Sequence, residues 1–414
     1  MSVNAPAVAT QPFSGKSNDA AVLKPAAPER LTSLDVYRGA AMMLMASEGL
    51  RIAAVAQKIP ESAFWAFLAY HTDHVAWSGC CLWDLIQPSF MFMTGVSLPY
   101  SIASRRAKGD SFQSLLGHAA IRSLILIFLG VFFRSVGEPQ TNFIFTDVLS
   151  QIGLGYIFLF LLGWTSPRTQ LAAAGAILVG YWAAFALYPL PPQGFDTRTV
   201  GVPADWKYQL SGFAAHWNKN TNIAHHFDTW FLNLFPRSKP FLFSNGGYQT
   251  LNFIPSLATM IFGLLAGNIL KSDRSGFDKF KTLLIAAFIG LTLGTILDVT
   301  GICPSVKRIW TPAWTLYSSG WTFLLLAIFY GIIDLQGYRR WSFPLLVIGM
   351  NSIAMYSLAH VDSSFHNTLR THLGKSFFAF AGAAYTPMLE QIAILFSMWL
   401  IILWMHQRKI FLRI

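Results

Sequence analysis

The chain has 414 residues, of which 54% are hydrophobic and only 12% are charged. Soluble domains carry about 25% charged residues, so this composition excludes an ordinary soluble protein and indicates a protein with several membrane spans. The formal net charge of +11 does not indicate nucleic-acid binding, because the basic residues occur in short clusters between apolar runs, as signals of membrane orientation do.

The first 30 residues are rich in Ala, Pro, Ser and Thr and lack the apolar core of a signal peptide, so they are predicted to be a disordered cytoplasmic tail. Residues 31–414 follow as the transmembrane domain. About ten apolar runs are long enough to cross a bilayer as helices, near residues 34–56, 85–103, 121–136, 148–164, 171–188, 251–270, 283–299, 314–333, 343–360 and 389–406. The predicted fold is an all-α bundle of these spans with one long external loop, residues 189–250.

Positive charge is concentrated in alternate loops, for example around Arg105 and Arg340. Loops of this kind face the cytoplasm in membrane proteins. With an even number of spans, both termini are then expected to be cytoplasmic. His74 and the long loop 189–250 are expected on the external side.

Titratable residues stand directly before the second apolar run, at His71, Asp73 and His74. Histidine is suited to carrying protons or an acyl group near neutral pH, because its unperturbed pKa is about 6.5. Asp84 begins the second run, and Glu48 lies two to three turns inside the first, where an unpaired charge costs roughly 3 kcal/mol or more. Each carboxylate is therefore expected to have a partner or to line a wet cavity.

The expected external loop carries Trp206, Trp217 and Trp230 together with several Asn and Gln residues. Loops of this length are often lids or binding elements. The aromatic rings suit stacking on the apolar faces of sugars, but they equally suit the aromatic belt of a membrane interface. The sequence leaves both interpretations open.

Two other classes of protein fit parts of the pattern. His71 and His74, with the His and Asp residues near 225–228 and 360–366, could converge as ligands in a metallohydrolase, but no stretch has a diagnostic metal spacing. No bound metal is therefore expected. Ten spans with internal charges and Gly or Pro interruptions also describe a secondary carrier of a small polar solute, although the second half shows no clear repeat of the first.

Several motifs carry a family resemblance. They are LTSLDVYRG at 31–39, HVAWSG at 74–79 and DLIQPSFMFMTGVS at 84–97, with supporting tracts at 148–156, 307–316 and 349–356. In this order they resemble the heparan-alpha-glucosaminide N-acetyltransferase family, specifically its bacterial members. The similarity runs over roughly residues 31–356.

The resemblance implies a multi-pass enzyme of the bacterial inner membrane, which moves an acetyl group from cytosolic acetyl-coenzyme A to an external amino sugar or glycan. It also implies that the histidine of the His-x-x-Trp-x-Gly motif, here His74, is central to transfer. His74 could act as a general base or itself accept the acetyl group, while Asp84 or Glu48 could orient its ring. Counting from Asp35, the family's asparagine at the outer end of the first span meets Gly49, so the adjacent Glu48 is a departure from the family pattern.

The remaining candidates follow from the same resemblance. The cytoplasmic candidates for binding the phosphates of a coenzyme A donor are Arg38, Arg105, Arg106 and Lys108, although each of them could instead serve only to fix the membrane topology. The motif residues expected to bind substrate are Trp77, Gln87 and Asn351. Packing through glycine-rich spans would permit a homodimer in the bilayer.

Overall fold

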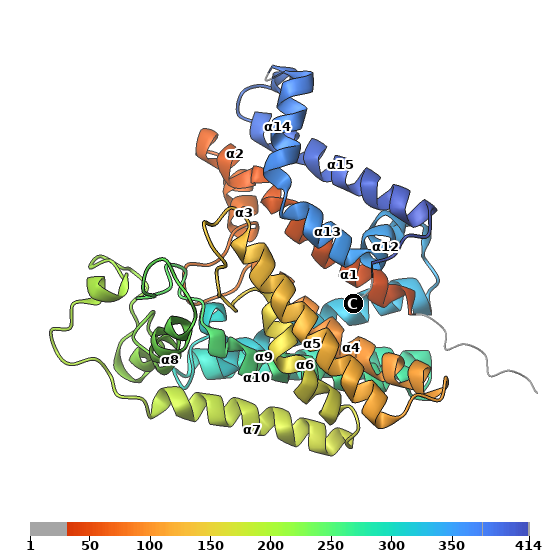
Figure 1. Cartoon of the computed structure of the whole chain (residues 1–414), viewed down its shortest axis with the longest axis horizontal. Helices are drawn as coiled ribbons and strands as arrows, with labels where there is room; N and C mark the ends of the chain where they lie inside the picture. The colour runs from red at the N-terminus through yellow and green to blue at the C-terminus, as the bar shows by residue number, and fades with distance from the viewer. Residues whose placement is uncertain (1–30, 375, 413–414) are drawn as a thin grey trace, which may run out of the picture. The chain divides into compact units, whose positions relative to one another are not determined.

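The computed structural model describes residues 31–374 and 376–412, and the predicted tail, residues 1–30, lies outside the described residues. The described chain forms helices and their connections (Figure 1), and its extended pairing is limited to an isolated bridge between Ser78 and Val306. The α-helices are α1 Thr32–Ala46, α2 Ile52–Lys58, α3 Ala63–His71, α4 Ile86–Arg106, α5 Phe112–Ser135, α6 Val148–Leu162, α7 Pro167–Ala186, α8 Ile223–Phe231, α9 Phe253–Lys271, α10 Gly276–Val299, α11 Pro312–Phe329, α12 Phe343–Met350, α13 Ser352–Ala359, α14 Asp362–Leu373 and α15 Thr386–Gln407. The predicted all-α fold is confirmed.

Six of the described helices are long and apolar enough to cross a membrane: α5, α7, α9, α10, α11 and α15. The number rises to eight if two bent pairs, α1 with α2 and α12 with α13, each form one span. The other two predicted spans correspond to α4, which is long but more polar, and α6, which has 15 residues where a bilayer requires about 20. The chain is therefore a polytopic helical membrane protein, while the predicted count of ten is not confirmed.

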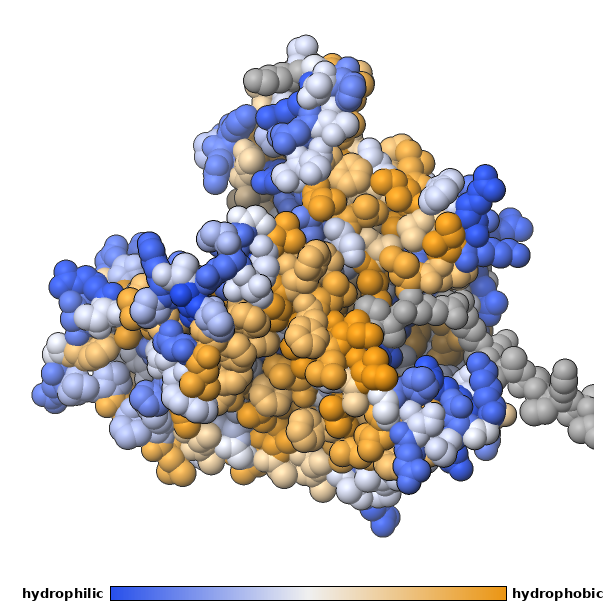
Figure 2. Space-filling model, in the orientation of Figure 1, coloured by the Kyte–Doolittle hydropathy of each residue, from blue (hydrophilic) through white to orange (hydrophobic). Residues whose placement is uncertain are grey.

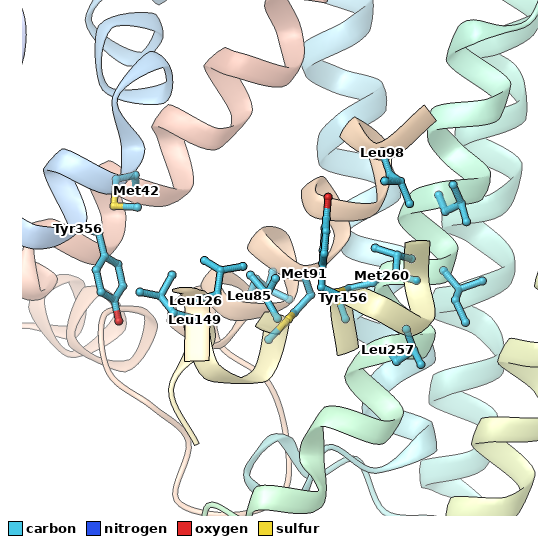
Figure 3. Packing of buried hydrophobic residues seen from close by; sticks show 14 of the residues in the cluster. Met42, Leu85, Met91, Leu98, Leu126, Leu149, Tyr156, Leu257, Met260 and Tyr356 are labelled. Carbon is cyan, nitrogen blue, oxygen red and sulfur yellow. The ribbon is translucent and has the colours of Figure 1, made fainter. Parts of the chain in front are cut away.

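The largest hydrophobic core of the described residues takes side chains from α1, α4, α5, α6 and α9 and also from α7, α11, α12, α13 and α15. In Figure 3, Leu85, Met91, Leu126 and Leu149 gather between these helices, and Tyr356 lies near Met42. Because the burial of these side chains fixes α4, α5 and α6 against one another, the helix ends that carry polar residues are fixed as well.

Glycines bring helices into backbone contact. A Cβ added at Gly95 of α4 would overlap the carbonyl oxygen of Met260, and one added at Gly263 of α9 would overlap the facing backbone of α4. Gly39 and Gly349 make the corresponding contact between α1 and α12. Small residues at such crossings are typical of membrane bundles, where close van der Waals packing holds the helices together.

Gly95→Ala is expected to lower the midpoint of thermal unfolding in detergent. The added methyl group has no space against α9, and overpacking of this kind costs about 1–3 kcal/mol. Gly175→Ala in α7 is the matched control, because nothing lies within 4 Å of the Cβ added there. Equal midpoints for the two variants would contradict the backbone contact between α4 and α9.

Apolar side chains cover much of the surface between hydrophilic ends. In Figure 2, hydrophobic residues occupy the middle of the visible face, and hydrophilic residues gather over α14 at the top and over the connection after α7 at the left. On α10, Phe288 is 70% exposed and Val299 is 75% exposed. Large apolar patches of this kind are unfavourable in water but contact lipid in a bilayer.

The connection between α7 and α9, the expected external loop, contains α8 and several short 3-10 turns. Trp217 is fully buried there, and its carbonyl accepts a hydrogen bond from the Trp77 indole at 3.1 Å. The Lys219 ammonium lies 4.8 Å from the ring centre of Trp206, whereas Trp230 is exposed. Trp217 therefore holds the connection together and is not available for stacking on a ligand.

Candidate active site

Asp84 is buried in the short turn directly before α4. Its Oδ1 atom lies 2.7 Å from His74 Nδ1 and 3.1 Å from Lys307 Nζ. Its Oδ2 atom accepts hydrogen bonds from the backbone N–H groups of Cys81 and Val75, at 3.2 and 3.4 Å. The local backbone therefore fixes the carboxylate, and the carboxylate holds the histidine and the lysine.

The geometry selects one tautomer of His74. A carboxylate oxygen at 2.7 Å from Nδ1 must receive a proton from that nitrogen, so Nε2 is left unprotonated in the neutral ring. Lys307 Nζ also lies 3.0 Å from Nδ1, but a protonated Nδ1 has no lone pair to offer, so the ammonium donates to Asp84. This is the arrangement of a base oriented by a carboxylate.

Burial and charge set the protonation states of the pair. Burial lowers the pKa of His74 below its ordinary value of 6.5; the hydrogen bond to Asp84 opposes this shift, and the nearby Lys307 charge adds to it. Burial alone would raise the pKa of Asp84, but the hydrogen bond with His74 and the Lys307 charge lower it well below its ordinary value. At neutral pH the imidazole is therefore neutral and the carboxylate is ionised.

Lys307 was not among the residues expected at the site. It comes from the turn between α10 and α11, 223 residues from Asp84, and its side chain is 4% exposed. Arg308 beside it donates to the carbonyl oxygens of Gly246 and Val75, at 2.7 and 3.2 Å, and so joins three segments. The sequence did hold a signal, since two adjacent basic residues on the expected external side depart from the usual placement of positive charge.

His74 lines a cavity of about 260 Å³. Gln87 of α4 lines it, as does Tyr248, whose ring meets the imidazole edge-on with 6.5 Å between the ring centres. Arg134 and Asp147 add one charge of each sign to the wall. The imidazole side chain is 34% exposed, against 1% for Asp84, so it is the member of the pair that a bound molecule can reach.

Of the three predicted substrate contacts, Gln87 alone lines this cavity. Trp77 is fully buried under the connection after α7. Asn351 is buried at the 73° bend between α12 and α13, where its amide donates to the carbonyl of Ile410 at 2.8 Å and accepts from Leu412 N–H at 3.1 Å. The fold does not bring Trp77 and Asn351 to the His74 cavity; both hold segments of the chain together.

Glu48 lines a different cavity from His74. It begins a left-handed turn at the end of α1, in which Glu48, Gly49, Leu50 and Arg51 have φ values of 44°, 63°, 48° and 53°. Arg51 Nη2 lies 2.7 Å from the Glu48 carboxylate. Of the two carboxylates predicted to orient the His74 ring, Asp84 contacts it, and Glu48 pairs with an arginine instead.

Arg105 is the basic candidate that lines a cavity. This space of about 240 Å³ is also lined by His118 and Arg122 of α5. On α4 the His74 cavity reaches Phe90 and the Arg105 cavity begins at Leu98. Eight helical residues span about 12 Å. The two cavities share no lining residue and lie toward opposite ends of α4.

The other three basic candidates do not gather with Arg105 at that cavity. Arg38 Nη1 lies 3.2 Å from the Asp35 carboxylate, one helical turn earlier in α1. The Arg106 guanidinium lies 5.5 Å from the ring centre of Trp164. Lys108 is exposed in the turn between α4 and α5.

The histidines considered as metal ligands do not converge. Within residues 31–374 and 376–412, no group of three His, Cys, Asp or Glu side chains is placed to hold a metal. In α8, burial lowers the pKa of His225 to about 4 and raises that of Asp228 to about 7. His366 Nε2 lies 3.2 Å from the Glu390 carboxylate.

The fold and the site define a polytopic membrane protein in which a buried carboxylate orients a histidine at a cavity. No family model matches the chain. Two proteins named heparan-alpha-glucosaminide N-acetyltransferase are similar to it: the Homo sapiens protein is 25% identical over 389 residues, and the Mus musculus protein is 24% identical over 373 residues. The alignments cover 84% and 79% of this chain but 55% and 53% of the relatives, so the chain spans about half the length of the curated relatives it matches. The resemblance predicted from the motifs is confirmed.

Proposed function

We propose that the chain is a membrane acetyltransferase, which transfers the acetyl group of acetyl-coenzyme A to the amino group of a sugar. The observation that carries this proposal is the cluster of His74, Asp84 and Lys307, in which a buried carboxylate holds a partly exposed imidazole at a cavity. Similarity to two N-acetyltransferases supports the reaction class.

In the proposed reaction, His74 Nε2 takes the proton of the acceptor amine as the amine attacks the thioester carbonyl. A carbon–nitrogen bond forms, the carbon–sulfur bond breaks, and the coenzyme leaves as a thiol after receiving that proton. In the alternative route, Nε2 attacks the thioester carbonyl first, and the carbon–sulfur bond breaks to release the coenzyme as a thiolate. The amine then takes the acetyl group from Nε2 and gives up the proton that converts the thiolate to the thiol. In both routes Asp84 keeps Nδ1 protonated and stabilises the positive charge that develops on the ring.

The donor is proposed to bind at the Arg105 cavity, at the ends of α4, α5 and α6 that lie away from the His74 cavity. Arg105 and its basic neighbours suit the coenzyme's phosphates, because guanidinium groups bind phosphate with paired hydrogen bonds. Met91, Leu126 and Ile152 are buried on the stretches of helix between the two cavities, so side chains in this layer must move for the thioester to reach His74. With basic loops facing the cytoplasm of a bacterial inner membrane, the donor side is cytosolic and the His74 side is external.

The test is to incubate the purified protein in detergent with labelled acetyl-coenzyme A and a panel of amino sugars. We expect free thiol to appear in the same amount as acetylated amine, identified by mass. A secondary carrier would instead move an amino sugar into proteoliposomes without consuming the donor, and that result would replace the proposal. Loss of thiol release on adding a chelator would point to a metal-dependent enzyme.

Lys307→Gln is expected to move the acid limb of the pH profile of thiol release to higher pH. The Lys307 charge disfavours the imidazolium form and so lowers the pKa of His74. Without that charge the pKa rises, and Nε2 becomes protonated at a higher pH. In the wild type, activity should persist below pH 6.5, the ordinary pKa of the group.

The matched control for this shift is Lys271→Gln, at the last residue of α9. Its ammonium lies 3.4 Å from the carbonyl oxygen of Pro99, and Lys271 is outside the lining of the His74 cavity. The acid limb of this variant should coincide with that of the wild type. A limb that stays in place in Lys307→Gln would show that the lysine charge does not reach the imidazole.

A further inference from the structure

A larger cavity, of about 860 Å³, lies at the same ends of α1 and α13 as the His74 cavity. Near the end of α1, Met45 lines the His74 cavity and Glu48, three residues later, lines the larger one. Near the end of α13, Tyr356 lines the His74 cavity and His360 lines the larger one. Binding sites for small molecules occupy roughly 300–1,000 Å³. The larger cavity has that size, whereas the His74 cavity, at about 260 Å³, has room for little beyond the reacting unit.

A further cavity, of about 310 Å³, shares lining residues with both the His74 cavity and the larger cavity. Arg134, Asp147 and Tyr356 line both this third cavity and the His74 cavity. His360 lines both the third cavity and the larger one, and its ring packs against that of Phe133 with 4.3 Å between the ring centres. The three spaces therefore share lining residues and neighbour one another from His74 to Glu48.

The left-handed turn at the end of α1 places two charged side chains in the wall of the larger cavity. Left-handed backbone costs roughly 1–2 kcal/mol for each residue other than glycine. The turn includes three such residues, Glu48, Leu50 and Arg51. Strain of this kind persists where the surrounding structure holds it, and it is concentrated at binding sites. Here Glu48 and Arg51 line the cavity, and Arg51 lies 3.8 Å from the Asp362 carboxylate as well.

The wall of the larger cavity has balanced formal charge. Three carboxylates and three Lys or Arg side chains line it, and two lining histidines, His360 and His366, are counted as neutral: the charged residues are Glu48, Asp362, Glu390, Arg51, Lys58 and Arg370. Arg370 holds Glu390 through two hydrogen bonds, at 3.0 and 2.9 Å. Pairs of this kind present donors and acceptors together, which suits hydroxyl groups. A sulfated or phosphorylated ligand would require a surplus of Arg and Lys.

We propose that the larger cavity is a second acceptor subsite, which binds an uncharged, hydroxyl-rich sugar unit linked to the amino sugar that reacts at His74. This inference rests on the proposed acetyltransferase function and specifies its acceptor as an unsulfated glycan of at least two sugar units. The neighbouring cavities with shared walls support an acceptor of more than one sugar unit. The balanced charge of the larger cavity supports a second unit that is uncharged.

The test compares kcat/KM for three acceptors in the thiol-release assay. These are glucosamine, a disaccharide of glucosamine linked to N-acetylglucosamine, and the same disaccharide with a sulfate on its second unit. We expect the neutral disaccharide to exceed both glucosamine and the sulfated disaccharide by about tenfold. Equal values for glucosamine and the neutral disaccharide, or a preference for the sulfated one, would overturn the subsite and leave the acetyltransferase in place.

Two charge variants test the larger cavity in opposite directions. Glu48→Gln removes one negative charge from the wall and should reduce the preference for the neutral over the sulfated disaccharide, whereas Lys58→Gln removes one positive charge and should increase it. Glu48 and Lys58 are exposed, so both variants should fold, which their thermal unfolding midpoints check. Glu61→Gln, exposed and outside the lining, is the matched control and should keep the wild-type ratio.

The outcomes separate the subsite from the function on which it rests. An unchanged ratio in both Glu48→Gln and Lys58→Gln overturns the subsite alone. Absence of thiol release with every acceptor overturns the acetyltransferase and the subsite together.

Discussion

His74→Ala is expected to abolish acetyl transfer, with thiol release falling by roughly 10²–10⁴-fold, the usual contribution of a positioned acid–base group. The substitution removes the nitrogen that receives the amine proton or carries the acetyl group. The imidazole side chain is 34% exposed, so the fold should tolerate its loss better than the loss of Asp84, which is buried. The measurement is the rate of thiol release by purified protein at saturating donor.

The matched control for this variant is His71→Ala. His71 ends α3, and its Nδ1 accepts a hydrogen bond from the backbone N–H of Leu82 at 3.4 Å. It lies three residues before His74 but does not line the His74 cavity, so its variant should keep most of the activity. If His74→Ala retained more than half of the wild-type rate, the assignment of His74 would be refuted.

Asp84 was one of two carboxylates predicted to orient His74, and its pairing with the histidine could be anticipated because both residues lie in one short stretch of sequence. A carboxylate that begins an apolar run needs a partner, and a histidine ten residues earlier is within reach of it. Lys307 was not predictable in the same way. It reaches Asp84 only because α4 and α11 pack near each other, and a contact across 223 residues leaves no periodicity in the sequence.

Glu48 shows where local pattern failed. An unbroken span over residues 34–56 places Glu48 inside a helix, but the structure ends α1 at Ala46 and bends the chain by 43°. Leu50 and Arg51 adopt left-handed backbone, which L-residues disfavour. Their residue types favour a right-handed helix instead, so the sequence predicts that the helix continues through them. Gly49 is the one residue in the turn that adopts a positive φ without steric cost. It also leaves room for the neighbouring chain, since an added Cβ would lie 2.7 Å from the carbonyl oxygen of Thr72.

Composition and charge predicted the class of fold but not which arginine lies at a cavity. Arg38, Arg105 and Arg106 have the same chemistry and all lie near the expected cytoplasmic boundary. Packing separates them, because Arg38 turns back to Asp35 and Arg106 lies over Trp164. Arg105 lines the space between α4 and α5, a distinction set by the rotation of each helix about its axis.

Asp84→Asn is expected to lower kcat by about 10³–10⁴-fold, with a smaller change in the KM of the acceptor. The amide group can donate to Nδ1, which would move the ring proton of His74 to Nε2. A protonated Nε2 can neither take the amine proton nor attack the thioester. The same change of tautomer accounts for the effect of an Asp-to-Asn substitution in serine protease triads.

A double variant separates this catalytic effect from lost stability. Asp84→Asn leaves the Lys307 ammonium, whose side chain is 4% exposed, without its carboxylate. Removing one partner of a buried ion pair costs about 3–5 kcal/mol, so the single variant should also unfold at a lower temperature. Asp84→Asn combined with Lys307→Met removes both charges and should restore the unfolding midpoint but not thiol release. If the double variant recovered transfer, Asp84 would serve only to balance Lys307, and the orientation of His74 would have to come from another group.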